Sequence, residues 1–231
     1  MLVRLALMMC AMVSPMFGQD TGQPVSKAMP APKLPFLDWK ACPFEGCAYR
    51  EWTARKAIAV YDTWEQKRRP VARLSPGDIV TGVTGVVITF KPGVIRMDRE
   101  LTPEKLKRGD TILTYTYRGE GFSAVWFNGR YYSEFDISFA KWPDGSGCGG
   151  AHCAATYADL GNKVWWAQVK LKSGSAGWVN MNDAEFDGVD LLAGILEPNP
   201  PSYAFRAAIS RWGLRPNSAG SRSTARQSAR S

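Results

Sequence analysis

Residues 165–179 read WWAQVKLKSGSAGWV, and they form the clearest strand–turn–strand pattern in the chain. Aromatic and β-branched residues dominate the first part, up to Leu171, as is typical of a strand. Ser173-Gly174 then provides a turn, and Gly177-Trp178-Val179 begins a returning strand. The stretch therefore predicts a closing β-hairpin.

Short apolar runs separated by turns continue upstream of this hairpin. Asn128-Gly129 is a strong hairpin signal, because both residues tolerate a positive φ. A Gly-Asp turn followed by an apolar strand occurs twice, at 77–83 and 109–115. The repetition is consistent with two related barrel units, but ordinary punctuation between strands is the favoured interpretation. The pattern as a whole predicts a mostly-β domain.

The segment 166–179 resembles the closing hairpin of bacterial SH3-like domains, which carry an aromatic residue and a Val on one strand, a Gly turn and a Gly-Trp-Val ending. Their opening is similar to residues 59–61, 70–74 and 77–80 of this chain (AVY, PVARL and GDIV). The resemblance implies a small SH3-like β-barrel. Because the two motifs lie roughly 90 residues apart, either one barrel carries a large insertion or two units lie in tandem.

The N-terminal residues 1–18, MLVRLALMMCAMVSPMFG, have the layout of a cleaved signal peptide. Arg4 precedes an apolar run that is too short to span a bilayer, and Ser14, Pro15 and Gly18 end the run. We therefore expect an exported protein, periplasmic or secreted, with no transmembrane segment after signal cleavage; an uncleaved N-terminal anchor is the alternative.

The rest of the chain divides by composition into three parts. Residues 19–40 contain Pro and Ala without periodicity and are predicted to be a flexible linker. Residues 41–195 hold the predicted SH3-like β domain. Residues 196–231 are predicted to be a basic, largely disordered tail.

The formal net charge of +8 belongs mainly to this tail. After residue 202 the chain has six Arg and no acidic residue, whereas residues 19–202 hold 22 basic and 21 acidic residues. The folded domain therefore lacks the basic balance typical of nucleic-acid binding, and we expect no nucleic-acid partner for it. The tail could contact anionic polymer or lipid headgroups.

Four cysteines remain after signal cleavage: Cys42, Cys47, Cys148 and Cys153. An even number in an exported protein favours disulfides, and the simplest of the three possible pairings joins Cys42 to Cys47 and Cys148 to Cys153. A four-cysteine metal site is the alternative, but the spacing lies at the edge of the zinc range and an oxidising compartment disfavours thiolates. We predict no metal and no cofactor.

The sequence contains few residues in settings that are typical of catalysis. His152 is the only histidine and directly precedes Cys153, so the two side chains tend to point apart. Glu120 lies between two glycines, and Glu134 and Asp136 share one face of a predicted strand. Glycoside hydrolysis needs only two carboxyl groups, but these settings are more typical of turns and surfaces. We therefore predict no catalytic residue.

Aromatic residues are the better candidates for a binding site. Trp165 and Trp166 must face opposite sides of a strand, as must Tyr131 and Tyr132, so one of each pair can pack inside while the other faces out. Trp178, in the closing motif, is predicted to be structural. The candidate binding residues are Trp126, Tyr131, Tyr132, Trp165 and Trp166.

Domains of the family that the chain resembles often belong to envelope proteins, bind cell-wall peptides or glycans, or accompany cell-wall hydrolases. Fold alone does not determine function. The hypothesis is an exported, non-catalytic binding module that recognises a cell-wall peptide or glycan, or an envelope protein. The alternatives are a cell-wall hydrolase that uses Glu120 and a structural or assembly protein that docks a protein partner.

Overall fold

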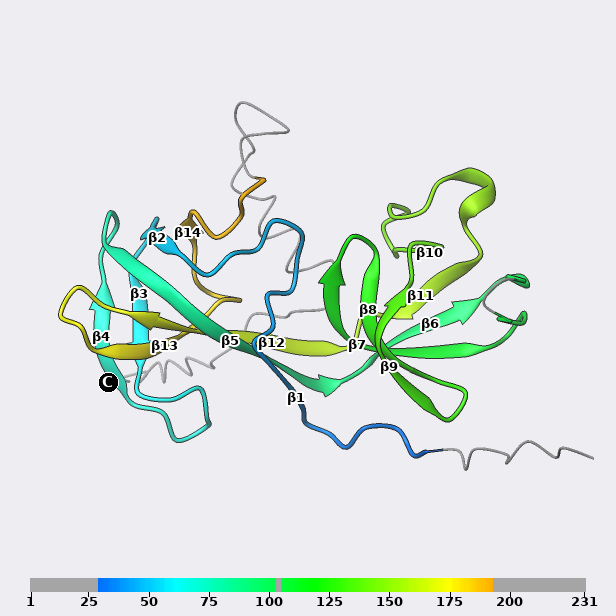
Figure 1. Ribbon diagram of the computed structural model, residues 1–231, viewed down its shortest axis with the longest axis horizontal. Helices are drawn as coiled ribbons and strands as arrows, with labels where there is room; N and C mark the ends of the chain where they lie inside the picture. Colours follow the sequence, from blue (N-terminus) through cyan, green and yellow to red (C-terminus); the bar gives the residue numbers. More distant parts are fainter. Residues whose placement is uncertain (1–28, 103–104, 193–231) are drawn as a thin grey trace, which may run out of the picture.

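The computed structural model describes residues 29–102 and 105–192. The prediction of a mostly-β chain is confirmed, because the regular structure of these residues consists of strands and one short 3-10 turn, Gly150–His152. The strands form two curled, half-barrel sheets that lie next to each other (Figure 1).

The first sheet is assembled from both ends of the described chain. Its order is β14-β2-β5-β12-β13-β3-β4, and β1 pairs with β5 beside that path. The strands are β1 (Phe36–Trp39), β2 (Glu51–Ala54), β3 (Ile58–Tyr61), β4 (Pro70–Leu74), β5 (Ile79–Lys91), β12 (Asn162–Lys170), β13 (Ala176–Asn180) and β14 (Phe186–Asp187).

The second sheet has the order β10-β11-β6-β7-β8-β9. Its strands are β6 (Gly93–Met97), β7 (Thr111–Gly119), β8 (Phe122–Phe127), β9 (Arg130–Asp136), β10 (Ala140–Lys141) and β11 (Ala155–Asp159). All of them come from residues 93–159, so this sheet is an insertion between β5 and β12 of the first. The segments 59–80 and 166–179 consequently belong to one sheet.

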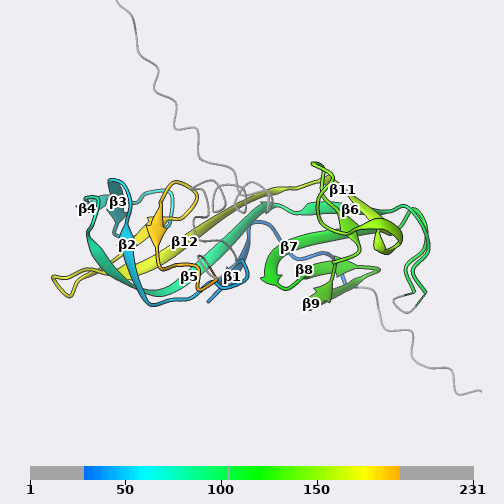
Figure 2. The ribbon, with the colours of Figure 1, turned by 90° about the horizontal axis from the view of Figure 1, so that it is seen from above.

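The two sheets are joined by a pair of long antiparallel strands. β5 runs from the first sheet toward the second, and β12 runs back beside it, as Figures 1 and 2 show. Lys91 is the register partner of Asn162 at the end of this pair, and the chain continues there into β6 and arrives there from β11. The chain therefore leaves the first sheet for the inserted sheet, and returns from it, at one point.

The predicted linker 19–40 is wrong at its C-terminal end. Residues 36–39 form β1, with Phe36 opposite Thr89 and Trp39 opposite Val86. Pairing with β5 satisfies backbone groups of both strands, and Leu37 packs against the buried residues of β5 and β12. The predicted signal peptide 1–18, residues 19–28 of the linker and the tail 196–231 lie outside the described residues.

Each sheet has its own hydrophobic core. Trp52, Trp165 and Met181, all fully buried, belong to the first core, and Ile95 and Ile112 belong to the second. Gly85 makes the first core possible, because a Cβ at this position would lie 2.7 Å from Trp165 Nε1. No larger residue fits where β5 crosses beneath the Trp165 ring.

The turns follow the sequence closely. Asn128 and Gly129 have φ of 47° and 74°, and they join β8 to β9 as the sequence predicts. The two Gly-Asp turns have the same hydrogen bonds: Asp78 Oδ2 accepts from the Ser75 amide at 2.8 Å, and Asp110 Oδ2 accepts from the Lys107 amide at 2.8 Å. One such turn begins the longest strand of each sheet.

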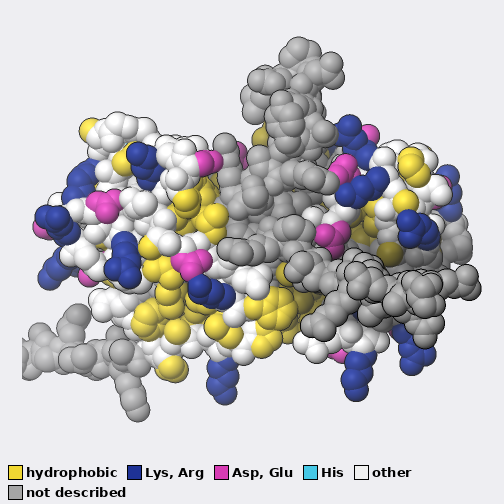
Figure 3. All heavy atoms as spheres, turned by 180° about the vertical axis from the view of Figure 1, so that it is seen from behind, with side chains coloured by type: hydrophobic (Ala, Val, Ile, Leu, Met, Phe, Trp, Pro, Cys, Tyr) yellow, Lys and Arg dark blue, Asp and Glu magenta, His cyan; other side chains and the backbone are white. Residues whose placement is uncertain are grey.

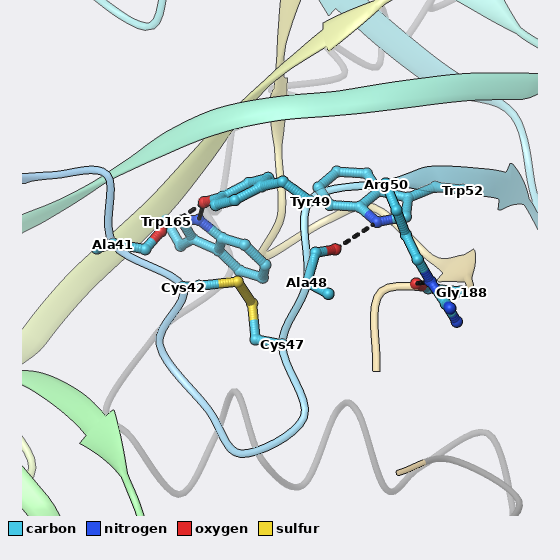
Figure 4. The surroundings of a disulfide bond; sticks show 9 residues. All are labelled: Ala41, Cys42, Cys47, Ala48, Tyr49, Arg50, Trp52, Trp165 and Gly188. Carbon is cyan, nitrogen blue, oxygen red and sulfur yellow. Dashed lines mark hydrogen bonds between the residues drawn. A yellow bond between two sulfur atoms is a disulfide. The ribbon is translucent and has the colours of Figure 1, made fainter. Parts of the chain in front are cut away.

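The predicted disulfide pairing is confirmed. Cys42 is bonded to Cys47 and Cys148 to Cys153, with Cα–Cα distances of 5.5 and 5.2 Å. The first bond closes a loop between β1 and β2, beside the buried Trp165 (Figure 4). Two disulfides are typical of an oxidising, extracellular compartment. Residues 29–102 and 105–192 contain no helix that is long and apolar enough to cross a membrane.

Candidate functional site

Two of the predicted binding residues, Trp165 and Trp166, are core residues. They face opposite sides of β12 as expected, but Trp165 is 0% exposed in the first core and Trp166 is 3% exposed on the other face. The prediction that one of them faces solvent is wrong, because both faces of β12 are covered at this point. Neither can offer its ring to a ligand.

The other three predicted residues, Trp126, Tyr131 and Tyr132, are half-buried on β8 and β9. Trp126 and Tyr131 are register partners and lie side by side. Trp126 Nε1 donates a hydrogen bond to the Met29 carbonyl at 3.3 Å, and the ring of Phe36 lies 5.8 Å from that of Tyr131. This part of the second sheet therefore contacts the chain's own N-terminal segment; a ligand role for these residues stays a prediction.

Tyr132 belongs to a separate group. Its ring lies 5.3 Å from that of Phe135, and the Arg130 guanidinium lies over it at 5.3 Å from the centroid. Tyr132 and Phe135 pack against the second core. The predicted binding set is thus dispersed over both sheets and does not form one surface.

Apolar side chains gather at the lower middle of the face drawn in Figure 3. A different aromatic group reaches solvent on the first sheet. Trp39, at the end of β1, is 51% exposed. Its ring lies 5.8 Å from that of Trp64, in the β3–β4 connection, and 6.3 Å from that of Trp178, on β13. Both pairs are edge-to-face. We name these three residues the tryptophan face.

The tryptophan face rests on a second aromatic layer. Tyr61 and Trp166 pack edge-to-face with centroids 5.8 Å apart. The Arg68 guanidinium lies 5.3 Å from the Tyr61 centroid and 4.8 Å from the Trp166 centroid, a cation–π arrangement. This layer fixes the base on which Trp64 and Trp178 pack, so the exposed rings are held in place before any ligand arrives.

A hollow of about 570 Å³ lies where the two sheets approach each other. One wall is the disulfide loop, through Phe44–Gly46, and another is the β7–β8 hairpin with Glu134 of the adjacent strand β9. Leu191 and Leu192 close a third side. Such a volume falls within the range of ligand sites. The hollow brings together two of the carboxylates singled out in the sequence, Glu120 and Glu134, whereas Asp136 does not line it.

Glu45, in the disulfide loop, is hydrogen-bonded across this hollow to the β7–β8 hairpin. Its Oε1 accepts hydrogen bonds from the Glu120 amide at 2.7 Å and from the Tyr117 hydroxyl at 3.1 Å. The first of these supports a turn in which Glu120 has a φ of 50°, a conformation that costs energy for a residue other than Gly.

A buried lysine lies at the junction of the sheets. Lys163, on β12, is 6% exposed, and its Nζ donates a hydrogen bond to the Leu160 carbonyl at 2.8 Å. Burial lowers the pKa of Lys163 to about 8, while nearby Asp159 acts in the other direction. The adjoining cavity of about 20 Å³ has room for a water molecule only. This site is therefore too small for a ligand.

The remaining sequence candidates are His152 and the disulfide-bonded cysteines. His152 is exposed in the loop that Cys148 and Cys153 close. Among residues 29–102 and 105–192, no three His, Cys, Asp or Glu side chains are grouped to hold a metal ion. Comparisons with protein-family models, curated proteins and solved structures gave no match. The tryptophan face and the hollow are therefore the two candidate functional sites.

Proposed function

We propose that this chain is an exported, non-catalytic binding module of the cell envelope, and that its tryptophan face recognises a cell-wall glycan or peptide. The observation that carries the proposal is the exposure of Trp39 against Trp64 and Trp178. Large aromatic side chains are useful where one end meets a partner and the other is packed. Three tryptophans from separate elements meet on one surface here, and packing alone gives no reason to leave Trp39 half in solvent.

Two further features support the proposal. The segments that resemble the opening and the closing hairpin of SH3-like domains are neighbours in the first sheet, because β13 pairs with β3 and β3 with β4. This arrangement favours one SH3-like unit with an insertion. The two disulfides favour an exported location, and the signal-peptide pattern of residues 1–18 agrees with it.

The test is sedimentation of the protein, residues 19–231, with purified peptidoglycan sacculi. Wild type should be retained, and Trp39→Ala should bind about fivefold more weakly, since one aromatic contact contributes about 1 kcal/mol. Trp142→Ala is the matched control, because it removes a half-buried tryptophan that stacks on Tyr157 of the other sheet and is not among the candidate binding residues. Equal binding by Trp39→Ala and wild type would overturn the assignment to the tryptophan face. No retention of wild type would favour a protein partner instead.

A cell-wall hydrolase is the second candidate function. It is favoured by one observation: Glu120 and Glu134, from different parts of the second sheet, line the same hollow. Clearing of a sacculus suspension by wild type, and its loss in Glu120→Gln, would replace the binding proposal with this one. We expect no clearing by either protein.

A further inference from the structure

The hollow between the two sheets is acidic. Glu45, Glu120 and Glu134 contribute three carboxylates, and within the described residues none of them forms an ion pair with Lys or Arg. Arg118 is the one basic side chain among the lining residues, and its Nη2 lies 2.8 Å from Asp38 Oδ2. Because Asp38 balances Arg118, the hollow keeps its negative charge.

The same hollow has an apolar side. Phe122, Leu191 and Leu192 line it and are 40%, 44% and 38% exposed. Exposed apolar surface next to uncompensated carboxylates fits a ligand that combines apolar and cationic groups. An anionic or purely polar ligand would leave one of these two features unmatched.

The described chain ends at this hollow. The Leu191 amide donates a hydrogen bond to the Gly46 carbonyl at 2.7 Å, and the Leu192 amide donates to Asp190 Oδ1 at 2.8 Å. These contacts fix the point from which residue 193 departs. The C-terminal segment of the sequence is therefore covalently attached at the rim of the hollow.

The sequence of this C-terminal segment has the complementary chemistry. Residues 193–202, AGILEPNPPS, lead into residues 203–215, YAFRAAISRWGLR. The second stretch contains five bulky apolar or aromatic residues and three arginines, and no acid occurs after residue 202. Ten connecting residues span up to about 30 Å when extended. Attachment at this distance gives an effective concentration of about a millimolar.

We propose that the hollow binds residues 203–215 of the same chain, with arginine side chains at Glu45, Glu120 and Glu134 and apolar side chains on Phe122 and Leu192. The tail is then an intramolecular ligand that links both sheets to the C-terminal segment. This inference concerns a surface separate from the tryptophan face and does not depend on what that face binds.

The test compares amide hydrogen exchange of Gly119–Phe122 in full-length mature protein with that in two triple variants. The first variant combines Arg206→Gln, Arg211→Gln and Arg215→Gln, and it removes the positive charges of the proposed ligand. The matched control combines Arg222→Gln, Arg226→Gln and Arg230→Gln, and it removes the same amount of positive charge further along the tail. We expect exchange at this hairpin to be about tenfold faster in the first variant than in wild type, and unchanged in the control.

A second pair of variants tests the receiving side. Glu120→Gln with Glu134→Gln should accelerate exchange at Leu191 and Leu192, whereas Glu51→Gln with Glu100→Gln, which removes equal charge outside the hollow, should not. Salt at about 0.5 M should diminish the difference, because it screens exposed charges. Wild-type exchange in the first arginine variant, or equal acceleration by both arginine variants, would overturn the proposal.

Discussion

The two sheets contain the same three-stranded meander, made in different ways. In the second sheet, β7, β8 and β9 follow one another directly, with Glu120 and Gly121 as the whole connection between the first two. In the first sheet, β5, β12 and β13 have the same order and antiparallel pairing, but residues 92–161 separate β5 from β12. The second sheet can thus form from local contacts, whereas the first must join distant parts of the chain.

The likeness extends to the start of each meander. The Ala54 amide donates to the Asp78 carbonyl at 2.8 Å, and the Gly77 amide donates to the Ala54 carbonyl at 2.8 Å. Met97 makes the same two bonds with Asp110 and Gly109, at 3.0 and 2.9 Å. The two sheets therefore share a local unit of turn and strand, and they differ in what the chain does at the end of that strand.

The largest expected effect separates the stabilities of the two sheets. Trp165→Ala should lower the free energy of unfolding by about 4 kcal/mol, because it empties the centre of the first core. Exchange should accelerate in β5, β12 and β13 and stay slow in β7 and β8, since the second sheet has its own core and local pairing. Ile112→Ala, in the second core, is the control with the opposite pattern. Equal acceleration in both sheets would show that they unfold as one unit.

The next effect arises at the junction of the sheets. Because the pKa of Lys163 is about 8 in the folded protein and 10.5 ordinarily, the folded state loses this proton first. The free energy of unfolding should therefore rise between pH 8 and about pH 10, by roughly 3 kcal/mol for the whole difference between the two pKa values. Above that range it should fall, because burial raises the pKa of Tyr49 to about 12 and also raises that of Tyr157.

Urea unfolding of wild type and Lys163→Met across pH 7–10 measures this effect. The substitution should raise stability at pH 7, since it replaces a buried charged side chain by an apolar one of similar volume, and should abolish the rise above pH 8. A wild-type profile that is flat over this range would contradict the buried, proton-releasing lysine.

A smaller effect compares the disulfides. Both close loops of sequence separation 5, so chain entropy alone gives each about 2 kcal/mol. Cys47 packs against the first core, whereas Gly149–His152 of the other loop are exposed. Replacing Cys42 and Cys47 by Ser should therefore lower the melting temperature more than the same change at Cys148 and Cys153. Equal losses would mean that the native contacts of the first loop contribute nothing.

The smallest effect tests the shared turns. Asp78→Ala and Asp110→Ala each remove one hydrogen bond to a turn amide, and each should cost about 1 kcal/mol in chemical denaturation. The two losses should agree, because the hydrogen bonds have the same length and sequence spacing. Clearly unequal losses of stability would show that the two turns have the same geometry but contribute differently to the stability of the fold.

Local features of the fold could be predicted from the sequence. The closing hairpin, the Asn128-Gly129 turn and the disulfide pairing depend on residues that are close in the chain, and all are present. The insertion could not be distinguished from tandem units. That distinction depends on β12 pairing with β5 across some 70 residues, which no local signal encodes.

The candidate site was harder to predict. Alternation correctly put Trp165 and Trp166 on opposite faces of a strand, but burial of the second face comes from Leu37, Tyr61 and Trp64. Trp39 was missed because it follows a Pro-containing stretch without periodicity. Its one signal was the apolar density of Phe36–Trp39 directly after that stretch. Glu45, in turn, meets Glu120 only after the disulfide loop folds against the β7–β8 hairpin.

The return of the chain to its point of departure has a mechanical consequence. If the two ends of the described chain are pulled apart, the hydrogen bond from the Met29 amide to the Gly129 carbonyl bears the force first. Once it breaks, tension enters through β1 at one end and through the segment 189–191 at the other. Both are bonded to the first sheet or to the disulfide loop beside it. After the Met29 contact is lost, the backbone of residues 93–159 lies outside this load path for as long as β5 and β12 stay paired. The first sheet then bears the force and the inserted sheet does not.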